Sequence, residues 1–77
     1  MRYRTALGHV LRTVRVEQDR TLRSVCGKHM SISHLSAVER GRQEISSEML
    51  EQVCERLGVK VSTVVSQASQ VLERAEA

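Results

Sequence analysis

Apolar residues recur every three or four positions along most of this chain, rather than at every second position. That spacing places them on one face of a helix, so the pattern predicts an all-α protein. No proline interrupts the predicted helices. They span residues 3–18, 21–29, 32–40 and 62–76, with a further helix between a cap at Ser46 or Ser47 and Gly58.

Small polar residues and glycines stand where these helices are expected to begin and end. A Ser or Thr side chain can accept a hydrogen bond from the free N–H groups of a first turn. Glycine disfavours a helix interior by about 1 kcal/mol and favours the position just after a helix. The predicted N-caps are Thr21, Ser31, Ser46 or Ser47, and Ser62, and the predicted ends are at Gly27, Gly41 and Gly58.

The chain of 77 residues is long enough for one domain, which we expect to cover residues 1–77. Its single aromatic residue, Tyr3, leaves few bulky core anchors, which favours support from a second subunit. The apolar stripe of helix 62–76 extends beyond what four preceding helices need, so we expect a dimer interface there. Packing of this stripe on the first helix is the alternative, and both can hold, with Val61 and Val64 inward and Val71 and Leu72 toward the partner. The expected interface residues are Val64, Val65, Ala68, Val71, Leu72 and Ala75.

Positive charge is concentrated in the first part of the chain. Residues 1–30 hold seven basic and two acidic side chains, whereas residues 31–77 hold five basic and seven acidic ones, for a net charge of +3. This division suits a protein that turns one face to phosphates and another to a protein partner. The chain has neither a signal-peptide pattern nor an apolar run of membrane-spanning length, so we expect it in the cytoplasm, at the nucleoid.

The short helices 21–29 and 32–40, joined by a tight turn, match the order of a helix-turn-helix DNA-binding domain. The segment TLRSVCGKHMSISHLSAVERGRQEISSEML, followed by LGV, resembles the xenobiotic-response-element class of regulators, relatives of the phage Cro and CI repressors. The resemblance covers about residues 5–66. Within the class the chain looks most like the regulators of Clp protease genes, on TLR, HLSAVERGRQEISSEML and the helix after LGV. The resemblance implies a five-helix bundle of the lambda-repressor-like helix-turn-helix type.

The chain departs from the family pattern in the turn of the motif. The family usually places ten residues between the small residue of the second helix and the apolar anchor of the third, but Cys26 to Leu35 is nine. Either the second helix ends early or the turn tightens, and the angle of the recognition helix depends on which occurs.

Helix 32–40 is the expected recognition helix, because the second helix of the motif enters the major groove. Its outward positions correspond to the base-facing positions of the resembled family, although a core position is the alternative for Ile32. The set has few strong donors, so we expect modest direct readout with a contribution from DNA shape. The expected base-contacting residues are Ile32, Ser33, His34 and Ala37.

Phosphate contacts are expected from basic and polar side chains beside the motif and from backbone amides at helix starts. For each Ser or Thr the alternative is a plain N-cap. The expected residues are Thr21, Arg23, Lys28, Arg40, Arg42, Gln43, Ser46 and Ser47.

Two charged residues are expected to hold the scaffold together rather than to bind DNA. In the resembled family, an arginine at the end of the first helix pairs with the glutamate of the ERG segment. In this sequence these residues are Arg15 and Glu39.

These observations predict a homodimeric, sequence-specific transcription regulator that binds double-stranded DNA at a near-palindromic operator. We expect no membrane, no small-molecule substrate, no cofactor and no metal, and a bundle this small hardly provides the shielded pocket of an enzyme. One alternative is an antitoxin-like protein-binding module that uses the acidic fourth helix and the apolar fifth. A zinc- or thiol-sensing regulator is the other, with ligands among Cys26, His29, His34 and Cys54, although the usual close ligand pairs are missing.

Overall fold

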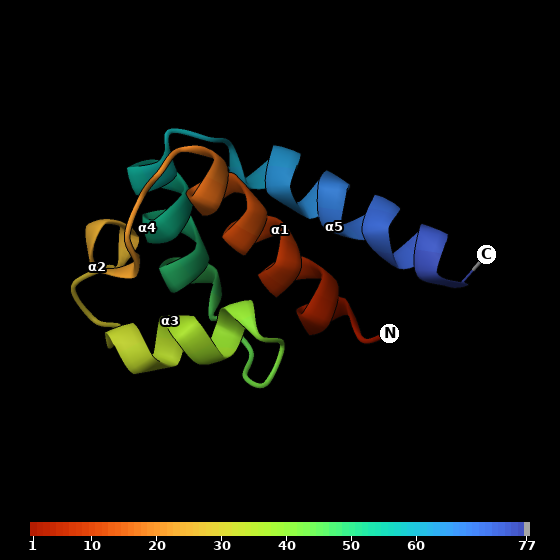
Figure 1. Cartoon of the computed structure of the whole chain (residues 1–77), viewed down its shortest axis with the longest axis horizontal. Helices are drawn as coiled ribbons and strands as arrows, with labels where there is room; N and C mark the ends of the chain where they lie inside the picture. The colour runs from red at the N-terminus through yellow and green to blue at the C-terminus, as the bar shows by residue number, and fades with distance from the viewer. Residues whose placement is uncertain (77) are drawn as a thin grey trace.

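Five α-helices make up the computed structural model, which describes residues 1–76 (Figure 1). They are α1 (Tyr3–Glu17), α2 (Leu22–Val25), α3 (Ile32–Glu39), α4 (Ser47–Leu57) and α5 (Val61–Glu76). Since this part of the chain contains no strand, the predicted all-α five-helix bundle is confirmed. No helix within residues 1–76 has both the length and the hydrophobicity to cross a bilayer.

The core forms around α1, which packs against both α3 and α5 (Figure 1). The apolar positions of α1 follow the helical period, so Ala6, Leu7, Val10 and Leu11 are buried together on one side. α2 packs against α3 and α4. The largest fully buried side chains are Leu11, Val25, Leu35, Val38, Val53, Cys54 and Val64.

The backbones of α1 and α3 touch at Gly8. A Cβ atom added there would collide with the carbonyl oxygen of Val38, so this position of α1 has no room for a side chain. The contact places α3 directly on α1 and sets the distance between the two helices.

Most predicted helix ends agree with the structure. The hydroxyl oxygens of Thr21, Ser31 and Ser46 each accept a hydrogen bond from the backbone N–H three residues later, at 3.1, 3.0 and 3.2 Å. These three bonds satisfy orphan donors at the starts of α2, α3 and α4. Gly41 and Gly58 follow α3 and α4 with φ of 75° and 71°, in the left-handed region that glycine tolerates.

The boundaries differ from the prediction most at the end of the second helix, and α1, α3 and α5 each differ by one residue at one end. The second helix ends at Val25 instead of continuing to residue 29, because Cys26 already has an extended backbone with φ −70° and ψ 126°. The missing residue of the turn is therefore accommodated by an early end of α2. The last helix begins at Val61, so Ser62 lies in its first turn and is not the residue before it.

Two residues of the predicted dimer interface are covered by the chain itself. Val64 and Ala68 are 1% and 0% exposed, because α5 lies against α1. These two side chains belong to the core of the single chain, as in the alternative in which the stripe packs on the first helix. The half-buried residues Val65, Val71 and Leu72 and the exposed Ala75 remain accessible on α5.

Candidate nucleic-acid interface

α3 lies at the edge of the bundle with one side packed inward and the other turned to solvent (Figure 1). Leu35 and Val38 on the inner side are 0% and 1% exposed, and they fasten α3 to the core. Ile32 at the start of the helix is 37% exposed, so the alternative that it is a core residue does not apply. The other expected base-contacting residues are the exposed Ser33 and the half-buried His34 and Ala37.

A groove of about 390 Å³ runs along the outer side of α3. It joins the start of α2 to the residues that follow α3. Three of the expected base-contacting residues and two of the expected phosphate-contacting residues therefore share one concave surface. The groove is lined by Leu22, Ile32, Ser33, Ser36, Ala37, Arg40 and Arg42.

The remaining expected phosphate contacts do not line this groove, and Gln43 lines a separate hollow with Tyr3 and Arg4 of α1. Thr21, Arg23, Gln43, Ser46 and Ser47 are all exposed. The hydroxyls of Thr21 and Ser46 are occupied as N-caps, so these two residues retain backbone N–H groups for a phosphate.

Lys28 also lies outside the groove. It is exposed, but it lines a separate hollow of about 550 Å³ together with Gln52, Glu55 and Arg56 of α4. The structure therefore does not bring Lys28 together with Arg40 and Arg42 at the groove.

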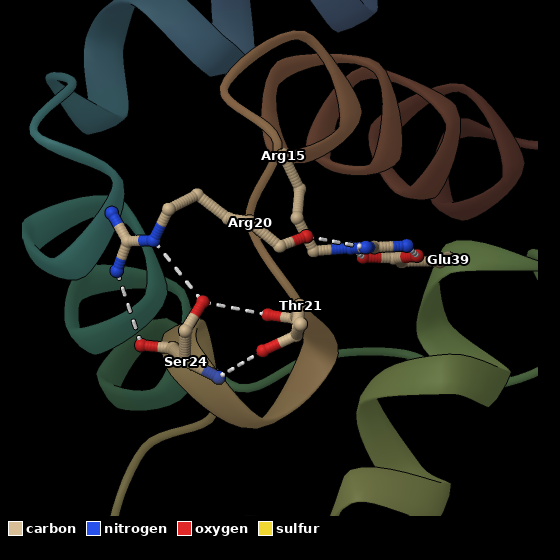
Figure 2. A network of polar contacts seen from close by, with 5 residues as sticks. All are labelled: Arg15, Arg20, Thr21, Ser24 and Glu39. Carbon is tan, nitrogen blue, oxygen red and sulfur yellow. Dashed lines mark hydrogen bonds and ion pairs between the residues drawn. The ribbon is translucent and has the colours of Figure 1, made fainter.

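Arg15 and Glu39 form a bidentate ion pair between α1 and α3 (Figure 2). Arg15 Nε donates to Glu39 Oε2 at 2.8 Å, and Nη2 donates to Oε1 at 2.9 Å. The hydrogen bonds that Arg15 donates to Glu39 raise the pKa of Arg15, against the opposing effect of burial. Arg15 Nη1 also donates to the carbonyl of Arg20 at 2.8 Å, so one guanidinium links α1, α3 and the chain before α2.

Arg20 is a positioning residue that the sequence did not reveal. Figure 2 shows its guanidinium beside Ser24 of α2: Nε donates to Ser24 Oγ at 3.1 Å, and Nη2 donates to the Ser24 carbonyl at 3.2 Å. Nη1 donates to the carbonyl of Arg56 near the end of α4, at 3.0 Å. A helix of one turn is not stable alone, and these bonds fix α2 on its neighbours. No spacing or motif distinguishes Arg20 from the other basic residues of this region.

The cysteine and histidine residues do not assemble into a metal site. No group of three or more His, Cys, Asp or Glu residues within 1–76 has metal-binding geometry. Cys54 is 1% exposed, and its burial raises the pKa of the thiol, which disfavours the thiolate that zinc requires. Cys26 donates through Sγ to the Met30 carbonyl, which holds the turn of the motif.

Known proteins share this arrangement. The chain is 42% identical over 74 residues to the transcriptional regulator ClgR of Mycobacterium tuberculosis, in both the CDC 1551 / Oshkosh and H37Rv strains. The alignment covers 95% of this chain and 66% of each relative, so the chain spans slightly less than two thirds of their length.

Solved structures are similar over nearly the whole chain. Two crystal structures of the clp gene regulator ClgR from Corynebacterium glutamicum are 40% identical, with TM-scores of 0.84 and 0.86. The alignments cover 92% and 99% of this chain, and 94% and 84% of the respective ClgR chains. The Streptococcus dysgalactiae SHP pheromone receptor Rgg2 is 33% identical with a TM-score of 0.74, over 79% of this chain and 23% of its own.

These findings confirm the resemblance to the helix-turn-helix regulators and, among them, to the regulators of clp genes. The expectation that the chain is not an enzyme is confirmed by the same relatives, which are transcriptional regulators. The family match covers residues 6–65 and includes all of α2, α3 and α4. The chain therefore belongs to the helix-turn-helix domain family.

Proposed function

We propose that this protein is a sequence-specific DNA-binding regulator of transcription, and that α3 is the helix that enters the major groove. The observation that carries the proposal is the groove along α3, where exposed base-contacting candidates lie beside Arg40 and Arg42. Its relatives bear the names transcriptional regulator and clp gene regulator. A regulator of this kind works where the chromosome is, in the cytoplasm at the nucleoid.

Outward-facing side chains of α3 read the bases. Ile32 and Ala37 contact thymine methyl groups, Ser33 bonds to more than one base, and His34 reaches a purine acceptor or a phosphate. None of these is a bidentate reader such as arginine on guanine, so DNA shape supplies part of the specificity.

Contacts to the DNA backbone position α3 in the groove. Arg40 and Arg42 supply charge directly beside it, and the exposed amides at the start of α4 receive a further phosphate. Such contacts carry affinity that falls with salt and is the same for all sequences.

Two copies of the chain bind together, through the part of α5 that α1 leaves uncovered. Val65, Val71 and Leu72 are half-buried in the single chain, and a second copy would complete their burial. A two-fold dimer presents two copies of α3 about 34 Å apart, which fits a near-palindromic operator with half-sites one DNA turn apart.

The test of DNA reading is selection of bound duplexes from a random pool at fixed salt, followed by affinity measurements on the enriched site. We expect a two-fold motif. The variant Arg42→Ala should weaken binding to all duplexes alike and reduce the salt slope by about 0.9, as for one lost phosphate contact. Ser33→Ala should change the preference at particular bases only. A pool without any enriched motif would contradict the proposal and favour a protein-binding module.

The test of the dimer is sedimentation equilibrium of the wild type and of Leu72→Glu. We expect the wild type to be dimeric and the variant monomeric, with weaker operator binding, because a charge would be buried without a partner. Ser66→Glu is the matched control, since Ser66 is exposed on α5 and lies outside the apolar stripe. Equal association of all three proteins would place the interface elsewhere.

A further inference from the structure

A second hollow lies beside the groove of α3 and has no role in the function described so far. It measures about 330 Å³ and borders the ion pair of Arg15 and Glu39. Three of its residues also line the groove, so the two concave surfaces are continuous. The hollow is lined by Arg12, Arg15, Leu22, Ser36, Glu39 and Arg40.

The charges around this hollow do not cancel. Glu39 is its only acidic residue, and both carboxylate oxygens of Glu39 are occupied by Arg15. Arg12 and Arg40 are exposed, and neither is in an ion pair within residues 1–76. Two positive charges therefore remain uncompensated on the wall of the hollow.

The position of Arg12 adds a new element to the interface. It lies on α1, one helical turn before Arg15, whereas the DNA contacts expected from the sequence all lie between residues 21 and 47. Arg40 follows α3 and lines the same hollow. An anion between the two guanidinium groups would sit at the rim of the α3 groove.

We propose that Arg12, with Arg40, binds a phosphate of the DNA backbone in this hollow, and that the DNA-binding surface therefore extends onto α1. This inference rests on the proposed function, since the phosphate is that of a duplex held by α3. A guanidinium matches phosphate with paired N–H donors, and these charge-assisted bonds are stronger than neutral ones. The Arg15–Glu39 pair serves the site indirectly, because it neutralises the one carboxylate that would repel the phosphate.

The test compares Arg12→Ala and Arg12→Lys with the wild type on a duplex enriched from the random pool. Affinity is measured by fluorescence anisotropy at several salt concentrations, from about 50 to 200 mM. Lys60→Ala is the control, because Lys60 is an exposed cation in the connection between α4 and α5. Figure 1 shows this connection on the opposite side of the molecule from α3. Circular dichroism melting verifies that all variants are folded at the temperature of the assay.

We expect Arg12→Ala to bind about tenfold more weakly at the lowest salt, as for the loss of one charge-assisted hydrogen bond. The slope of log affinity against log salt should be smaller by about 0.9. The loss of affinity relative to the wild type should therefore become about 3.5-fold smaller between the lowest and the highest salt concentration. Arg12→Lys should keep the slope because it keeps the charge. Lys60→Ala should keep both affinity and slope, and the base preference of Arg12→Ala should equal that of the wild type.

Several results would overturn the inference. A folded Arg12→Ala protein with wild-type affinity and slope, beside a weakened Arg42→Ala protein, would remove Arg12 from the interface and leave the proposed function intact. Stabilisation by inorganic phosphate that depends on Arg12, with an unchanged salt slope on DNA, would assign the hollow to a free anion instead. A wild-type protein that binds no duplex would overturn both the inference and the function on which it rests.

Discussion

Removal of the Arg15–Glu39 ion pair tests whether the recognition helix depends on α1 for its position. The two side chains are only 14% and 5% exposed, so the pair lies largely out of water. Loss of one partner from a buried pair typically costs about 3–5 kcal/mol, because the other charge stays buried without compensation. For a domain of this size the whole free energy of unfolding is of similar magnitude, so single variants approach the limit of folding.

The two partners should not be equivalent. Arg15→Met leaves the Glu39 carboxylate charged at 5% exposure and removes the donor to the Arg20 carbonyl. We therefore expect the full loss of about 3 kcal/mol or more, and a melting temperature lower by roughly 12 °C or more. Glu39→Gln keeps an amide oxygen that can accept from Arg15, and Arg15 retains its bond to the Arg20 carbonyl. The expected loss in the free energy of unfolding is therefore smaller, about 1–2 kcal/mol. The double variant Arg15→Met with Glu39→Gln removes both charges and should be more stable than Arg15→Met alone.

Urea titration followed by far-UV circular dichroism measures all three variants against the wild type, with an unchanged denaturant slope as the condition for comparison. The double-mutant cycle then isolates the interaction between the two residues. Additive losses in the double variant, or a loss below about 1 kcal/mol for Arg15→Met, would refute the view that this pair fastens α3 to α1.

Three further changes test other contacts. Gly8→Ala should lower the free energy of unfolding by about 2 kcal/mol or more, because the new Cβ atom collides with the Val38 carbonyl oxygen. The loss is measured as a lower urea midpoint, and a midpoint equal to that of the wild type would contradict this prediction. Ser46→Ala should cost about 1 kcal/mol in the same assay through loss of the α4 cap, and Ser46→Gly clearly less. Burial raises the pKa of the Cys54 thiol above the ordinary 9.0, so less thiolate forms at mildly alkaline pH. Iodoacetamide should therefore modify Cys26 first, and equal rates for the two thiols in the folded protein would contradict the burial argument.

The helices and most of their ends follow from local chemistry that is visible in the sequence. Thr21, Ser31 and Ser46 each precede an apolar stripe, and a hydroxyl at that point has a local partner three residues later. The resemblance to helix-turn-helix regulators adds the order of the elements and the partnership of Arg15 with Glu39. These features depend on neighbours along the chain or on a shared motif.

Features that depend on what covers a surface were harder to predict. The stripe on α5 has the right period, but period alone does not tell whether α1 or a second subunit buries Val64 and Ala68. Arg20 gives no signal either, because its acceptors are backbone carbonyls, and every residue carries one. The surroundings of the turn after α2 give no signal either: Gly27 lies so close to the Gln52 side chain that a Cβ atom would collide with it, and this contact exists only in the assembled bundle.

The absence of a side chain at Gly8 affects more than local packing. No side-chain atoms separate the backbones of α1 and α3 at Gly8, so a shift of α3 along α1 would bring backbone atoms into collision. α5 packs against the same helix α1. The three helices therefore behave as one stiff body that runs from the groove to the outer surface of α5. If α5 joins two copies, a duplex with mismatched half-site spacing has to twist or bend to fit, since the protein will yield very little.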